Sequence, residues 1–149
     1  MKRIIRTDNN NLDFQALITE LDAYLKITDG VDHEFYNQFN SLKKINHVVV
    51  AYQNEQAIGC GAFKKLDTNT AEIKRMYVKP THRGSGVANT VLSSLEQWAS
   101  EKGFIKCILE TGSRQIEANK FYKKSGYRSI PNYGQYAQVE DSNCFEKLI

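Results

Sequence analysis

The stretch Val78-Lys-Pro-Thr-His-Arg-Gly-Ser-Gly-Val-Ala88 marks the point at which the chain changes from a strand pattern to a helix pattern. Before it, residues 71–78 are rich in strand-forming side chains. After it, apolar residues recur with the period of a helix, and these are Val87, Val91, Leu92, Leu95, Trp98 and Ala99. The pattern therefore predicts a strand, a glycine-rich joint and a helix in direct succession.

This joint is predicted to bind an anion. The first turn of a helix leaves about four backbone N–H groups without internal partners, and the helix dipole adds partial positive charge there. Arg83 adds a permanent cation, while Gly84 and Gly86 allow the backbone to approach a ligand closely. Phosphate or pyrophosphate suits such a site. The alternative is that the glycines only permit a tight turn and that Ser85 caps the helix.

Two common phosphate-binding motifs fit the joint poorly. A nucleotide P-loop needs a glycine, four further residues, and then Gly-Lys followed by Ser or Thr, and the chain has no such run. A dinucleotide-binding turn places a third glycine or alanine where Asn89 stands. The joint by itself therefore indicates a phosphate ligand without specifying which one.

The elements around the joint predict one α/β domain over residues 1–149. Strands are expected at residues 2–6, 47–52, 57–63, 71–78, 105–109, 127–130 and 143–148. Helices are expected at residues 12–27, 34–40 and 115–124, and from the joint to a stop at Lys102 and Gly103. This order predicts a mixed sheet whose central helix crosses between neighbouring strands.

Composition argues against several other classes of protein. The net charge is +3 with basic residues scattered along the chain, so nucleic acid is not an expected partner. No apolar run approaches the roughly 18 residues of a membrane span. We therefore expect a cytoplasmic location and no membrane partner. Cys60, Cys107 and Cys144 are odd in number and far apart, which favours buried reduced thiols over disulfides or a zinc site.

Four short motifs together resemble the GNAT family of N-acetyltransferases. One is Arg83-Gly-Ser-Gly-Val-Ala88, and the others are Glu72-Ile-Lys-Arg-Met-Tyr-Val78, Leu109-Glu-Thr-Gly112 and Asn119-Lys-Phe-Tyr-Lys-Lys-Ser-Gly-Tyr127. Their order and spacing extend the resemblance over residues 71–127. It implies a GNAT acyl-CoA acyltransferase fold, in which helices flank a central, mostly antiparallel sheet whose fourth and fifth strands splay apart.

The resemblance implies acetyl-CoA as co-substrate and no metal. The CoA pyrophosphate would lie against the backbone of the joint, at Arg83, Gly84, Ser85, Gly86, Val87 and Ala88. The pantetheine arm would lie between the splayed strands and pair with the backbone there as an added strand does, at Met76, Tyr77 and Val78. Asn119 matches a family side chain that contacts the pantetheine or stabilises the wedge between the strands.

The implied reaction is direct attack of a primary amine on the thioester of acetyl-CoA in a ternary complex. Tyr122 matches the general acid of the family, and a phenol with an ordinary pKa of about 10 still carries a proton to give to the thiolate. Glu72 is the candidate base, with Glu110, His82 or water as alternatives. A solvent-facing Glu72 that pairs with a lysine is the structural alternative.

Strand alternation is used to place the side chains near Glu72. It predicts that one face carries Glu72, Lys74, Met76 and Val78, and that the opposite face carries Ile73, Arg75 and Tyr77.

The acceptor is left open as a small molecule, a peptide or a protein. The segment Ile130-Pro-Asn-Tyr-Gly-Gln-Tyr136 resembles a loop of small bacterial family members, so Tyr133 and Tyr136 either line the acceptor site or cover the sheet edge. Four acidic residues would attract a cationic amine or form a solvated helix face, and these are Asp22, Asp29, Asp32 and Glu34. Two alternative functions are a CoA-binding module without turnover and a transferase of longer acyl groups. A homodimer is a further hypothesis.

Overall fold

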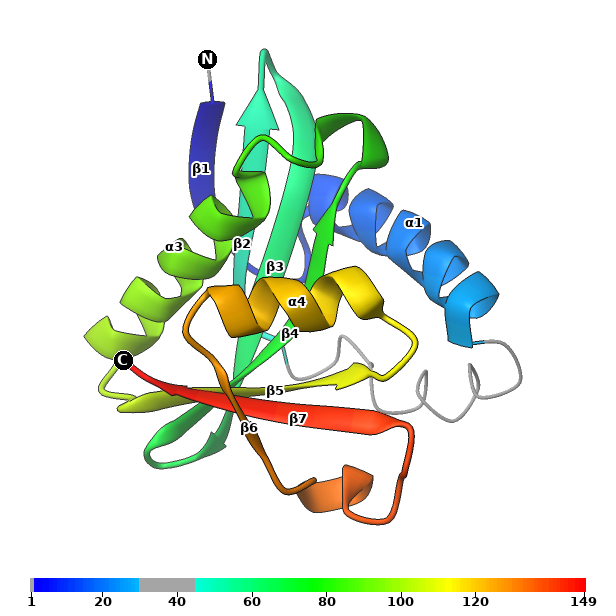
Figure 1. The fold of residues 1–149 in the computed structure, drawn as a ribbon. Helices are drawn as coiled ribbons and strands as arrows, with labels where there is room; N and C mark the ends of the chain where they lie inside the picture. The colour runs from blue at the N-terminus through cyan, green and yellow to red at the C-terminus, as the bar shows by residue number, and fades with distance from the viewer. Residues whose placement is uncertain (1, 30–44) are drawn as a thin grey trace.

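The computed structural model describes residues 2–29 and 45–149, and it contains one seven-stranded sheet (Figure 1). Its strands follow the order β1-β2-β3-β4-β5-β7-β6. Their bounds are β1 Lys2–Thr7, β2 His47–Gln53, β3 Gln56–Asp67, β4 Thr70–Val78, β5 Lys106–Gly112, β6 Arg128–Ile130 and β7 Ser142–Leu148. Every predicted strand is therefore present, with β3 and β5 running several residues further than expected.

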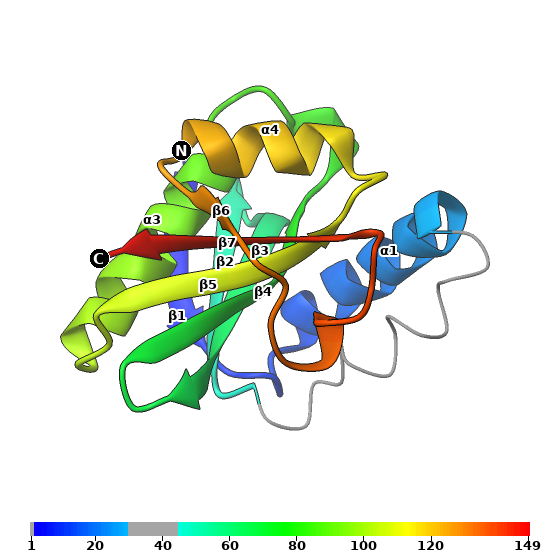
Figure 2. The same ribbon diagram turned by 60° about the horizontal axis from the view of Figure 1, so that its bottom comes forward.

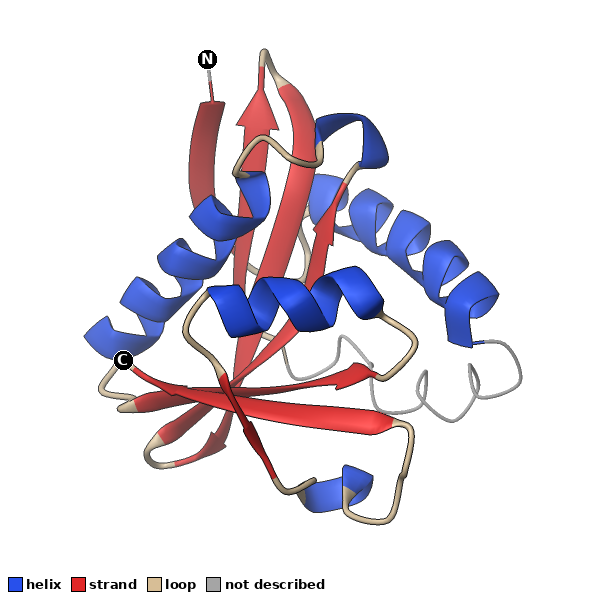
Figure 3. Cartoon of the chain, in the orientation of Figure 1, coloured by secondary structure: helices blue, strands red, loops and turns tan. Residues whose placement is uncertain are grey.

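Helices cover both faces of this sheet. α1 (Leu12–Asp29) packs on one face, while α3 (Val87–Glu101) and α4 (Ile116–Lys124) pack on the other, as Figures 1 and 2 show from two directions. Short 3₁₀ turns, η3 (Pro80–His82) and η4 (Gly134–Tyr136), follow β4 and β6 (Figure 3). The mixed α/β prediction is confirmed, and the helix expected at residues 34–40 lies outside the described residues.

Each face of the sheet carries its own apolar core. Because successive strand residues point to opposite faces, the run Val48-Val49-Val50 in β2 contributes to both. Val48 and Val50 pack with Phe14 and Leu17 of α1, and Val49 packs against α3. The three cysteines are buried and free, as predicted. No helix within the described residues is long and apolar enough to cross a membrane.

The strands β4 and β5 are parallel and pair only where they begin. Three residue pairs join them, Thr70 with Lys106, Ala71 with Cys107 and Glu72 with Ile108. Beyond these pairs β4 continues beside β3, whereas β5 continues beside β7. The predicted splay of these two strands is confirmed, and it leaves a wedge whose β4 side runs from Ile73 to Val78.

A β-bulge in β4 lies inside this wedge and overturns the predicted alternation. Tyr77 pairs with Cys60 but Lys74 pairs with Ala62, so Arg75 and Met76 together oppose Gly61, and Arg75 has φ 59°. The register shift places Lys74 and Arg75 together on the α1 face. Arg75 forms an ion pair with Asp22 of α1, whereas Met76 and Val78 pack in the α3 core. The expectation that Glu72, Lys74, Met76 and Val78 share a face is therefore wrong. The opposite set is also divided, because Ile73 packs in the α3 core while Arg75 and Tyr77 lie on the α1 side.

Gly61 makes the bulge possible. A Cβ atom at Gly61 would approach Cδ1 of Leu95 to 2.8 Å and would collide with the sulfur of Met76. Because Gly61 has no side chain, the side chain of Met76 can occupy the space above this residue of β3.

Candidate active site

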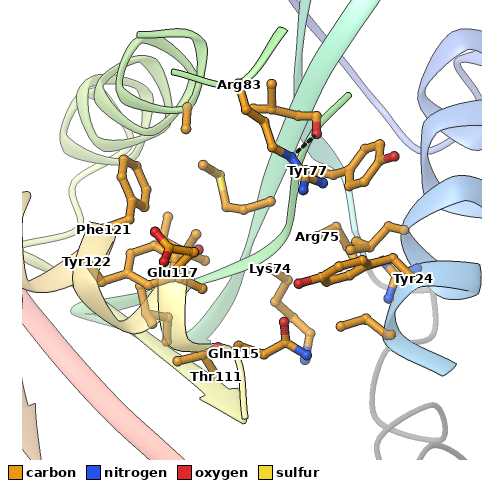
Figure 4. Close-up of a pocket in the computed structure, with 18 of the residues that line it drawn as sticks. Tyr24, Lys74, Arg75, Tyr77, Arg83, Thr111, Gln115, Glu117, Phe121 and Tyr122 are labelled. Atoms are coloured by element: carbon orange, nitrogen blue, oxygen red, sulfur yellow. Dashed lines mark hydrogen bonds between the residues drawn. The ribbon is translucent and has the colours of Figure 1, made fainter. Parts of the chain in front are cut away.

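The wedge between β4 and β5 holds a pocket of about 810 Å³ that reaches residues from both faces of the sheet (Figure 4). We call its two parts the α3 half and the α1 half. The α3 half is formed by Met76, Val78, Arg83, Gly84, Gly86, Val87, Ala88, Phe121 and Tyr122. The α1 half is formed by Tyr24, Leu25, Glu72, Lys74, Arg75, Glu110, Gln115 and Tyr136.

The glycine-rich joint forms one end of the α3 half. Gly84 and Gly86 both have positive φ, at 81° and 86°, and Gly86 is the residue at which α3 is capped. No side chain among the described residues caps this helix, and the hydroxyl of Ser85 instead donates to the carbonyl of His82 at 2.7 Å. The alternative that Ser85 caps the helix is therefore wrong, and Ser85 does not line the pocket.

The start of α3 leaves backbone donors at this end of the pocket. Thr90 N donates to Gly86 O at 3.1 Å, and the N–H groups of Val87, Ala88 and Asn89 precede that first helical bond. All three residues line the pocket. Backbone donors grouped in this way at a helix N-terminus are of the kind that bind anions, so the sequence-based prediction of an anion site stays a prediction.

Arg83 connects the joint to the end of β4. Its Nε donates to the carbonyl of Val78 at 2.9 Å, which Figure 4 marks with a dashed line. Its guanidinium also lies over the rings of Tyr24 and Tyr77, at 5.5 and 5.7 Å from their centroids. The cation is thus held at the pocket by one hydrogen bond and by contacts with two aromatic rings.

The β4 edge of the wedge carries the residues expected beside the pantetheine. Met76, Tyr77 and Val78 all line the pocket and have no β5 partner. Their other edge pairs with β3, through Cys60 and Gly59. The phenol of Tyr77 turns away from the wedge and donates to Glu20 of α1 at 3.1 Å.

Tyr122 reaches the pocket from α4. Its ring packs beside Tyr127 and Phe145, with centroids 5.8 and 6.4 Å away. Within the described residues no hydrogen bond engages its hydroxyl, and burial raises the pKa of this phenol. The phenol of Tyr122 therefore stays protonated at neutral pH, and its hydroxyl has no hydrogen-bond partner among the described residues.

Asn119 lies behind the pocket and is not among its lining residues. Its amide nitrogen donates to the carbonyls of Gln115 at 2.7 Å and Gly112 at 3.1 Å, and its oxygen accepts from Asn143 at 3.0 Å. These bonds join the start of α4 to β5 and β7. Of the two roles that the resemblance implied for Asn119, the contacts match support of the wedge.

The two candidate carboxylates occupy different environments. Glu72 is 2% exposed, accepts from the phenol of Tyr133 at 2.7 Å, and lies 3.7 Å from Lys64 Nζ and 4.0 Å from Lys74 Nζ. Glu110 is only partly buried and accepts from the hydroxyl of Ser142 at 2.6 Å. Both carboxylates line the α1 half.

The remaining predicted residues divide between the pocket and other places. His82 lines the pocket on η3, where its Nδ1 lies 3.0 Å from the hydroxyl of Thr81. Tyr136 is buried and lines the α1 half. Tyr133 does not line the pocket, and its phenol donates a hydrogen bond to Glu72. Asp22 is held by Arg75 at 2.6 Å. Asp32 and Glu34 lie outside the described residues, as does the side chain of Asp29.

Sequence reasoning missed most of the α1 half. Lys74 and Arg75 were assigned to opposite faces, and Tyr24 and Gln115 were not considered for the pocket. Gln115 links two elements across it, since its amide donates to Thr28 of α1 at 2.8 Å. Charged residues inside an otherwise apolar strand were the one available signal, because a buried charge needs a purpose or a partner. Figure 4 shows Tyr24 and Arg75 on the α1 side of the pocket, opposite Phe121 and Tyr122, with Lys74 between the two sides and Gln115 next to Thr111.

The sequence profile described as the Acetyltransferase (GNAT) family matches residues 14–127. An IAA acetyltransferase of Azospirillum brasilense is 32% identical over 134 residues, which are 88% of this chain and 87% of that protein. The uncharacterized N-acetyltransferase YsnE of Bacillus subtilis is 36% identical over 101 residues, 66% of this chain and 67% of that protein. The chain therefore belongs to the GNAT family.

Solved structures agree with this assignment. A Klebsiella pneumoniae protein assigned as an acyl-CoA N-acyltransferase superposes with a TM-score of 0.83 at 27% identity, covering 99% of this chain and 97% of that one. The PaiA N-acetyltransferase of Thermoplasma acidophilum, crystallised with coenzyme A, shares the fold with a TM-score of 0.74 at 20% identity, covering 100% of this chain and 99% of that one. Fold and family together make the protein an acyl-CoA-dependent N-acetyltransferase. Among the described residues, no group of three or more His, Cys, Asp or Glu is placed to hold a metal ion.

Proposed function

We propose that the protein transfers the acetyl group of acetyl-CoA to a primary amine by direct attack in a ternary complex. One observation carries this proposal: a continuous pocket extends from the backbone donors of α3, past Tyr122, to the charged α1 half. Two reactants that enter from opposite faces of the sheet can meet inside the wedge. Holding them together supplies much of the rate gain in such transfers.

The donor would occupy the α3 half. Its pyrophosphate would accept from the free N–H groups at the start of α3, near Gly86 and Ala88. Its pantetheine arm would pair with the open edge of β4 between Met76 and Val78. Coenzyme A in the PaiA structure, which has the same fold, supports this choice of donor.

Tyr122 would act as the general acid. As the acceptor nitrogen bonds to the acetyl carbon and the carbon–sulfur bond breaks, the phenol gives its proton to the sulfur of CoA. Burial keeps that proton on the phenol until the thiolate forms. Of the two protons that the ammonium loses, one replaces the proton of Tyr122 and the other passes through the base to solvent.

A carboxylate of the α1 half would be the base, acting directly or through water. Glu72 is nearly inaccessible, and its carboxylate already contacts the phenol of Tyr133 and two lysines, which leaves it little access to an incoming amine. Glu110 is more accessible on the same face, which supports it as the base ahead of Glu72. His82 belongs to the joint and lies on the donor side of the pocket.

Thermal unfolding with acetyl-CoA, CoA and ATP tests the donor, and release of the CoA thiol across a panel of amines, amino acids and peptides tests the reaction. Both CoA species should raise the Tm, since a ligand at about 100 times its Kd adds roughly 2.7 kcal/mol of stability. Stabilisation by ATP alone would refute the proposal. Binding of CoA with no turnover on any acceptor would indicate a binding module instead, and turnover only with longer acyl-CoA thioesters would change the donor.

A further inference from the structure

The α1 half places two cations next to two anions in one small space. The bulge at Arg75 puts the side chains of Lys74 and Arg75, which are neighbours in sequence, on the same face. Glu72 and Glu110 project from β4 and β5 onto that face as well. A positive φ at a residue other than glycine is a strained backbone conformation, so the surrounding packing must hold Arg75 in place.

Arg75 keeps unused hydrogen-bonding capacity beside the pocket. Its side chain is 2% exposed, and one terminal nitrogen binds Asp22 at 2.6 Å. Its Nε is buried and has no acceptor among the described residues. A buried donor without an acceptor is costly, and a carboxylate that enters the pocket beside Arg75 would improve the balance of charge and hydrogen bonds there.

Lys74 is a second buried cation beside Arg75. Its side chain is 5% exposed, and its Nζ lies 4.0 Å from Glu72, a carboxylate that Lys64 approaches to 3.7 Å. Burial lowers the pKa of Lys74, while Glu72 and Glu110 act in the opposite direction. A ligand anion at this place would stabilise the ammonium further.

We propose that the acceptor is a small zwitterion of the amino-acid class. Its ammonium faces Glu110, and its carboxylate binds between Lys74 and Arg75. This inference rests on the proposed function, because it names the substrate of the same pocket. The ring of Tyr24 and the side chain of Leu25 offer an apolar surface for the rest of the molecule. A polyamine or other purely cationic acceptor would set a second positive charge against Lys74 and Arg75.

Matched pairs of acceptors test this assignment through release of the CoA thiol. Each pair consists of an amino acid and the amine left after loss of its carboxylate, such as phenylalanine with phenethylamine, leucine with isopentylamine, and ornithine with putrescine. We expect kcat/KM to be at least about tenfold higher for the amino acid in at least one pair. Preference for the plain amine in every pair would overturn the inference and leave the proposed function standing. Absence of turnover with every pair would also overturn it, and turnover of a peptide would then separate this failure from failure of the proposed function.

Lys74→Met and its matched control Lys79→Met show where the preference arises. Lys79 follows the same strand, pairs with Glu20 at 3.3 Å and does not line the pocket. Lys74→Met should raise KM for the amino acid about tenfold and leave that of the plain amine unchanged, whereas Lys79→Met should keep the preference. Retained preference in Lys74→Met and in Lys74→Gln, with a normal Tm shift by acetyl-CoA, would refute the role of Lys74.

Discussion

The two halves of the pocket are built in opposite ways. Apart from Phe121 and Tyr122 of α4, the α3 half draws on residues 76–88, one nearly continuous stretch that includes the backbone N–H groups at the start of α3. The α1 half collects side chains from α1, β4, β5 and the start of α4, which are far apart in sequence. A site made of local backbone geometry accepts the same ligand wherever that geometry recurs, whereas a site made of assembled side chains can differ between members of one family. The comparison therefore explains why the donor is more readily inferred than the acceptor.

The largest expected effect on kcat comes from replacing Tyr122, which the pocket's α3 half contains. Tyr122→Phe should lower kcat by about 100-fold or more with little change in the KM for acetyl-CoA, because it removes a proton donor and no binding surface. Steady-state kinetics with a turned-over acceptor measure both constants. Tyr127→Phe is the matched control, since Tyr127 is buried beside Tyr122 but donates to Glu96 at 2.8 Å, outside the pocket. An unchanged kcat in Tyr122→Phe would remove it as the acid.

A second pair of variants separates the two carboxylates of the α1 half. Glu110→Gln should reduce kcat/KM by about 100-fold at neutral pH, because a general base contributes about that much. Glu72→Gln should mainly lower the free energy of unfolding, by about 1–3 kcal/mol, since it leaves Lys64 and Lys74 without their carboxylate. Kinetics and chemical denaturation of both proteins decide between them, and the reverse pattern would make Glu72 the base.

The β-bulge in β4 can be disturbed by a substitution in the neighbouring strand β3. Gly61→Ala should destabilise the protein by about 1–3 kcal/mol, because the added methyl group meets Leu95 and Met76. If β4 relaxes to make room, Lys74 and Arg75 lose their common face and acceptor KM rises more than donor KM. Denaturant unfolding and the two KM values measure these effects. A variant with wild-type stability would contradict the packing described for Met76.

The smallest expected effect concerns the backbone of the joint. Gly86→Ala leaves space for the methyl group but forces alanine to φ 86°, at a cost of about 1–2 kcal/mol. The Kd for acetyl-CoA should rise about tenfold with the acceptor preference unaltered. Gly134→Ala is the control, because Gly134 also has positive φ and open space but lies outside the pocket. Equal effects of both variants on the Kd would argue against a pyrophosphate at Gly86.

Prediction from the sequence succeeded where the determining interactions are local. The strand before Val78, the turn through Gly84 and Gly86 and the start of α3 depend on residue types within a dozen positions. It failed at β4 because alternation assumes a regular strand. The bulge there depends on Gly61, a residue of the neighbouring strand, and strand alternation along β4 takes no account of it.

The sequence by itself therefore determined the mixed sheet, the glycine-rich joint between β4 and α3 and, through four ordered motifs, the family. Only the tertiary structure decided which charged side chains line the α1 half of the pocket. Asp22 and Arg75 are 53 positions apart and form an ion pair, and Gln115 and Thr28 are 87 positions apart and form a hydrogen bond. Such contacts exist only when α1, β4 and α4 are packed together, since no local propensity encodes them. The α3 half of the pocket is built mostly from neighbouring residues of the chain, whereas the α1 half forms only when distant segments pack together.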